Sequence, residues 1–118
     1  MSIEHRIVAT IVEFKVNVPK NLPDGAVNLK IVSELSKIGC KKVRISNVTE
    51  TVWNKDVGVE VEIPYKSQED VDKRVDAIKS VLEDVKRDLE EMSKIHEYFD
   101  FVKGTLRDVL AKEGIDYL

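Results

Sequence analysis

Alternating apolar and polar residues mark three stretches of the chain as β-strands. In residues 6–18 every second residue from Val12 onward is apolar, and in residues 57–65 the alternation is the cleanest in the sequence. This two-residue period is typical of a strand with one buried face. Residues 43–52 are the third candidate, and a change of apolar parity predicts a bulge near Asn47. The last two strands make a hairpin.

Two other stretches have the three-to-four-residue apolar period of amphipathic helices. The first covers residues 26–38 and ends at Gly39, a residue suited to a helix C-terminal cap. The second begins after Ser67, whose hydroxyl precedes an acid by three residues, as in a capping box. We expect Gly104 to interrupt it and residues 105–112 to form a short last helix. In this second stretch the positions of one seam are separated alternately by four and three residues, which is a coiled-coil pattern. The seam consists of the apolar residues Val71, Val75, Ile78, Leu82, Val85, Leu89 and Met92, followed by His96 and Phe99.

These elements predict a single α+β domain with a small antiparallel sheet. Residues 1–66 supply the sheet and the first helix, and residues 67–118 are helical. A strand–helix–strand–strand order is the first part of a ferredoxin-like sandwich, in which the third strand inserts between the first two. The fourth strand of that arrangement is absent from the prediction, because helix occupies its place in the chain.

Composition narrows the class of protein. The chain has 118 residues, of which 42% are hydrophobic and 35% charged, so neither a disordered nor a collagen-like chain fits. Met1–Arg6 lacks the layout of a signal peptide, and no run approaches the roughly 20 apolar residues of a membrane span. We therefore expect a cytoplasmic protein. Many charges with few thermolabile residues are typical of proteins from hot habitats.

Charge is unevenly distributed along the chain. The net charge is −3, with +2 on residues 1–66 and −4 on residues 67–97, so a nucleic-acid surface would have to lie on the first half. One basic cluster is present there, without the aromatic residues on which bases stack: Lys30, Lys37, Lys41, Lys42 and Arg44. Such a cluster is usually a solvated edge. A salt-sensitive gel shift with generic DNA or RNA would instead favour binding.

Candidate catalytic residues are few. Cys40 follows a helix C-terminus, where the dipole disfavours a thiolate, so a structural thiol is the simpler interpretation. His5 and His96 are too far apart for metal ligation, and His96 fits a polar position that fixes the register of the apolar seam. Glu60 and Glu62 share one side of a strand and are expected to face water. No nucleotide, metal or cofactor motif is present in the sequence, and we expect no cofactor.

The sequence therefore favours a non-enzymatic interaction or assembly module that forms a homodimer or a larger even-numbered oligomer, with another protein subunit as a further partner. The long helix should extend past its own sheet, and the first strand is apolar on both faces near residues 7–11, with one edge unpaired. The alternative is a small nucleic-acid-binding or regulatory protein that uses Lys37–Arg44, and an enzyme ranks third. The expected oligomer interface draws on both elements: Ile7, Ala9, Ile11, Leu89, Met92, Ile95, His96 and Phe99.

Overall fold

A computed structural model describes residues 3–112, with side chains for residues 3–95. It is a mixed α+β structure in which two strands precede the first helix and two follow it. The elements in chain order are β1 (Glu4–Val8), β2 (Ile11–Pro19), α1 (Asp24–Lys37), β3 (Val43–Glu50), β4 (Asn54–Glu62) and α2 (Gln68–Lys112).

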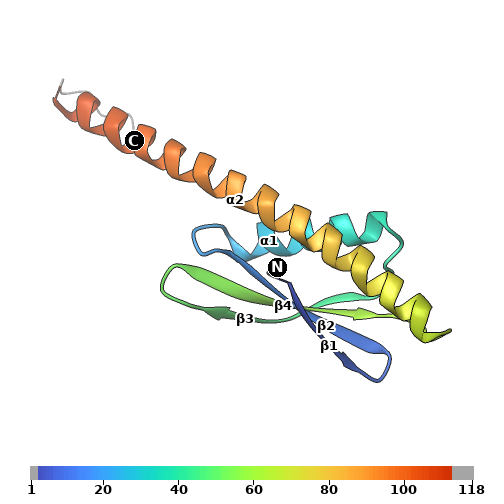
Figure 1. The fold of residues 1–118 in the computed structure, drawn as a ribbon. Coiled ribbons are helices and arrows are strands. Elements are labelled where there is room, and N and C mark those ends of the chain that lie inside the picture. The colour runs from blue at the N-terminus through green and yellow to red at the C-terminus, as the bar shows by residue number, and fades with distance from the viewer. Residues whose placement is uncertain (1–2, 113–118) are drawn as a thin grey trace.

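The four strands form one antiparallel sheet in the spatial order β1-β2-β4-β3. Both helices lie on one face of this sheet, and the other face is uncovered (Figure 1). β4 therefore lies between β2 and β3, the strands on either side of α1. Alternation decides which side chains face the helices, since Val12, Phe14, Val57 and Val59 are buried while their polar neighbours point the other way.

The expected long strand at residues 6–18 is wrong, because the chain turns back at Ala9 and Thr10. Val8 pairs with Ile11, so β1 and β2 form a tight hairpin, and Ala9 adopts a φ of 55°. Neither turn residue is a glycine, asparagine or aspartate, so the sequence lacks the usual hairpin signal. β1 thus pairs with the edge of β2 that was expected to be bare. Every residue of β1 is exposed in the single chain, so this chain itself does not cover the segment on both faces.

The predicted bulge in the third strand is confirmed. The pairing of β3 with β4 shifts register between Ile45 and Asn47, which leaves Ser46 as the extra residue. Gly58 lies opposite this point, and a Cβ atom there would come within 2.4 Å of the Ser46 Oγ. The bulge and the glycine therefore fit together as one local feature.

The apolar seam of the long helix packs on the sheet as its spacing predicts. Ser67 Oγ accepts a hydrogen bond from the Asp70 backbone N–H at 3.1 Å, which confirms the start of the helix. The seam is buried from its first residue to Leu89, together with residues of α1 and the sheet. Its members are Val71, Val75, Ile78, Leu82, Val85 and Leu89.

The predicted break at Gly104 and the separate short helix are wrong. α2 is one helix of 45 residues that continues through Gly104 to Lys112. A glycine inside a helix costs about 1 kcal/mol relative to alanine but keeps its backbone hydrogen bonds, so it need not end the helix. The C-terminal part of α2 extends beyond the sheet and α1 (Figure 1), and the longest dimension of the molecule is 69 Å. No helix within residues 3–112 is both long and apolar enough to cross a membrane.

Candidate functional site

The uncovered face of the sheet carries a row of four charged residues across the strands. Arg6 lies opposite Glu13, Glu13 opposite Glu60, and Glu60 opposite Arg44. Each carboxylate is paired with the arginine beside it, at 2.6 Å for Arg6 Nη2–Glu13 Oε2 and 3.0 Å for Arg44 Nε–Glu60 Oε2. These ion pairs offset the repulsion between the two central carboxylates. The row is therefore a charge-balanced surface, and it gives no reason for general acid–base chemistry at Glu60.

The other expected carboxylate, Glu62, lies two residues further along the same face. Its Oε2 is 3.2 Å from Lys42 Nζ, and its side chain is exposed. Glu60 and Glu62 thus each have a separate basic partner, as expected of a solvated face. Among the described residues, no group of three or more His, Cys, Asp and Glu side chains is arranged to hold a metal ion.

The basic cluster is spread over α1, the following loop and β3, and most of its charge is already paired. The hydrogen bond from Lys37 is the main cause that lowers the pKa of Glu34 below its usual value. Lys41 has no ion-pair partner within the described part of the chain. The nearest carboxylate contacts of the other four are Lys30–Asp88 at 3.4 Å, Lys37–Glu34 at 2.9 Å, Lys42–Glu62 at 3.2 Å and Arg44–Glu60 at 3.0 Å.

A cavity of about 460 Å³ lies beside Cys40, between the loop after α1 and the first half of α2. Its apolar lining includes Val61, Ile63 and Ile78, and Arg74 lines the same space. Burial raises the pKa of the Cys40 thiol, and the Arg74 charge lowers it by a smaller amount. Cys40 is therefore held as a neutral thiol, consistent with the structural interpretation.

Alkylation of Cys40 should report this environment directly. Since the thiolate is the reactive form, the rate with iodoacetamide should rise with pH around a midpoint above that of a free cysteine. Arg74→Gln should move the midpoint further up, because the guanidinium favours the thiolate. Cys40 is the only cysteine, so the reaction has a single site, and N-acetylcysteine is the reference. A midpoint at or below the reference would contradict the burial argument.

Exposed apolar side chains gather at the β1–β2 hairpin. Ile7, Val8 and Ile11 are each between 39% and 49% exposed, and Ala9 in the turn is exposed. These include the three first-strand residues expected at an interface. They form a small patch at the corner of the sheet, on side chains that belong to both of its faces.

A second set of exposed apolar side chains begins where α2 leaves the body of the protein. The last described contact is made by Ser93, whose Oγ donates to Asn21 Oδ1 at 2.6 Å and whose backbone carbonyl accepts from Asn21 Nδ2 at 3.3 Å. Met92 and Ile95, on either side of Ser93, are 42% and 54% exposed. α2 continues for slightly more than five turns past the contact between Ser93 and Asn21, at about 3.6 residues per turn. We call residues 94–112 the projecting segment.

The predicted interface residues on α2 therefore divide into three groups. Leu89 is fully buried against its own chain, so it belongs to the core and offers no surface to a partner. Met92 and Ile95 are exposed, as an interface requires. The side chains of His96 and Phe99 lie outside the described part of the structure.

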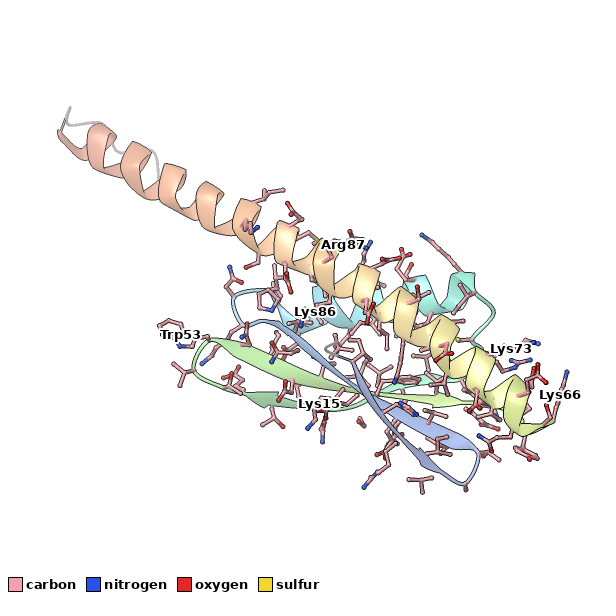
Figure 2. The ribbon with its side chains drawn as sticks, viewed as in Figure 1. Lys15, Trp53, Lys66, Lys73, Lys86 and Arg87 are labelled. Atoms are coloured by element: carbon pink, nitrogen blue, oxygen red, sulfur yellow. The ribbon has the colours of Figure 1, made fainter. Side chains whose placement is uncertain are left out.

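Two features escaped the sequence interpretation. Val52 and Trp53 are 76% and 83% exposed at the tip of the β3–β4 hairpin, and Figure 2 shows Trp53 at the end of the molecule from which α2 projects. Lys55, which falls between the predicted strands at residues 43–52 and 57–65, lies in β4 and is buried. It shares the parity of Val57 and Val59, a signal that could have placed it on the inner face.

Comparison with known proteins adds no family to this description. No protein-family model matches the chain, and neither a curated protein nor a solved structure shows significant similarity to it.

Proposed function

We propose that this protein is a non-enzymatic assembly module that associates with itself through the projecting segment of α2. The observation that carries the proposal is the exit of α2 from the body. Among the described side chains, Ser93 makes the last contact of α2 with the rest of the chain, whereas the helix continues to Lys112 and exposes Met92 and Ile95.

Helix energetics support a partner for this segment. Most of the stability of a protein helix comes from packing an amphipathic face, since isolated helices are only marginally stable in water. The sequence of the projecting segment contains Phe99, Val102, Leu106 and Val109, all apolar and spaced by three or four residues. A stripe of this kind is usually covered in a soluble protein. We propose that a second copy covers it, in a coiled-coil arrangement.

The β1–β2 hairpin is the weaker candidate for the interface. The argument for pairing first strands depended on a bare edge of the strand that is now β2, and β1 pairs with that edge. β1 has a free outer edge of its own, but it is only five residues long, and short edge strands are one way in which proteins limit edge-to-edge pairing.

The nucleic-acid alternative is weakened by the ion pairs of the basic cluster. Four of its five members have carboxylate partners, and phosphate contacts would have to replace these pairs. The enzyme interpretation finds a cavity beside Cys40, but the arrangement there favours a neutral thiol and provides no activated nucleophile.

The fold is compatible with a module of this kind. We interpret the sheet as a variant of the ferredoxin-like sandwich in which the N-terminal strand β1 takes the edge position of the missing fourth strand. We further propose a cytoplasmic location, on the composition and the single cysteine.

Sedimentation equilibrium at micromolar concentration tests the proposal. We expect the mass of a dimer or of a larger even-numbered oligomer. Ile95→Glu should raise the dissociation constant at least about 100-fold, because a carboxylate would be buried in an apolar contact. Leu29→Glu is the matched control, since Leu29 is an exposed leucine on α1, and it should leave the mass unchanged.

Circular dichroism should show that Leu29→Glu keeps the wild-type spectrum and that Ile95→Glu loses at most the helix signal of the projecting segment, because both positions lie outside the core. A wild-type protein that remains monomeric at these concentrations would overturn the proposal. Dissociation by Ile7→Glu, with no effect of Ile95→Glu, would place the interface on the β1–β2 hairpin instead.

A further inference from the structure

The seam of α2 continues past Leu89 at Met92, His96 and Phe99, but next to the polar His96 lies an exposed apolar residue, Ile95, from which a second apolar stripe begins. The spacings of the seam alternate between four and three, but Leu89, Met92 and Ile95 are separated by two consecutive steps of three. At about 100° per residue, the second step of three turns the stripe by roughly a quarter turn away from the core-facing seam. The spacing beyond Ile95 returns to alternating fours and threes at Phe99, Val102, Leu106 and Val109.

The side chains around the exit agree with this change. Ser93 faces the body and contacts Asn21, whereas Met92 and Ile95 are exposed. We call Met92, Ile95, Phe99, Val102, Leu106 and Val109 the outer stripe. Its two members with described side chains, Met92 and Ile95, are exposed, so the stripe is suited to a separate partner.

Charge along this part of the helix is arranged in two blocks of opposite sign. Residues 90–100 contain four carboxylates and one lysine, whereas residues 101–112 contain three basic residues and one aspartate. Two parallel helices in register would place like charges side by side. Two antiparallel helices place the acidic block of each, residues 90–100, beside the basic block of the other, residues 101–112. The two helix dipoles then point in opposite directions, which is also favourable.

We propose that two copies of this chain pair through their outer stripes in antiparallel orientation. This arrangement rests on the self-association proposed above and specifies its geometry. With a twofold axis midway between residues 99 and 102, the helix position of Ile95 lies level with that of the partner's Leu106, and the position of Met92 lies level with that of the partner's Val109. The same register places Glu91 within one helical turn of the partner's Lys112, and Lys94 level with the partner's Arg107, the one pair of like charges at the same level. All six positions of the outer stripe then find an apolar partner, as an isologous interface requires.

The geometry of a single copy is compatible with this pairing. The outer stripe and the residues after it span about 30 Å at 1.5 Å per residue. The sheet and α1 occupy the other part of α2 (Figure 1), so antiparallel pairing keeps the two bodies at opposite ends of the helix pair.

Disulfide cross-linking distinguishes the two orientations. In a Cys40→Ser background, Ile95→Cys and Leu106→Cys variants are prepared separately, one of them carrying a size tag, and are oxidised alone and as a mixture. We expect the mixture to form the mixed 95–106 disulfide and each variant alone to cross-link little, because only the antiparallel register brings these Cβ atoms within bonding distance. Met92→Cys with Val109→Cys provides a second, independent pair.

Each result bears on one of the two proposals. Efficient self-cross-linking of Ile95→Cys alone would overturn the antiparallel orientation while supporting self-association. Absence of any cross-link in both pairs, in a protein that sediments as a dimer, would overturn the outer stripe as the contact. A wild-type monomer in sedimentation would overturn the self-association on which the inference rests.

Discussion

Leu82→Ala is expected to lower the free energy of unfolding by about 2–5 kcal/mol, the range for truncating a buried leucine. Leu82 is fully buried in the middle of the α2 seam, among apolar side chains of the core. Removal of its isobutyl group loses the transfer free energy and leaves a cavity that the sheet cannot fill. The loss is a large part of the 5–15 kcal/mol that is typical of a domain.

Urea denaturation followed by circular dichroism measures this change, at one fixed protein concentration because association is coupled to unfolding. Leu89→Ala should behave in the same way, since Leu89 is also fully buried. Leu29→Ala is the matched control, because Leu29 is a leucine on α1 that is 71% exposed and lies outside the proposed interface, so its truncation should cost less than about 1 kcal/mol. An equal loss for Leu82→Ala and Leu29→Ala would contradict the burial of the α2 seam.

The seam was predictable because burial in a helix depends on a period that the sequence displays directly. Positions 71–89 follow that period, and the structure buries all of its members. The capping signal at Ser67 was equally local, since a hydroxyl three residues before an acid is a common pattern at the start of a helix. The sequence therefore predicts those features of α2, its start and its buried face, that depend on residues within the helix itself.

The hairpin at Ala9 and Thr10 was not predictable for the opposite reason. A run of alternating and apolar residues continues through both turn residues, and neither is a residue that favours a positive φ. The turn is held by strand pairing on either side, and by a hydrogen bond of 2.8 Å from the Ile63 N–H to the Thr10 carbonyl. The bond between Ile63 and Thr10 is a long-range contact, which a local sequence pattern does not contain.

In the candidate interface, too, one part was predictable from the sequence and another part depended on long-range contacts. Exposure of Met92 and Ile95 followed from the expectation that the helix extends past its sheet. The burial of Leu89 did not follow from that expectation. How far α2 is covered by its own chain depends on how far the loop before α1 reaches along the helix. The contact between Asn21 and Ser93 sets that limit, and it joins residues 72 positions apart in the chain.

A second expected result concerns Lys55, whose buried ammonium group holds the loop between β2 and α1. Its Nζ donates a hydrogen bond to the Leu22 carbonyl at 2.7 Å and a short one to Asp24 Oδ1. The residue is only 2% exposed, while the Asp24 side chain is mostly in contact with solvent. Leu22 packs in the core and Asp24 begins α1, so one lysine of β4 fixes both the loop and the start of the helix.

Lys55→Met should lower the free energy of unfolding by about 1–3 kcal/mol, because methionine keeps most of the apolar stem but leaves the Leu22 carbonyl without a donor. The exposed Asp24 carboxylate can return to water, so the loss stays below the roughly 3–5 kcal/mol expected when a fully buried ion pair loses one partner. Asp24→Asn is the control, since it removes the charge and retains the bond to Leu22. It should cost less than Lys55→Met in the same urea titration. Equal losses for the two variants would show that the stabilisation comes from the ion pair with Asp24 and that the Leu22 carbonyl contributes little.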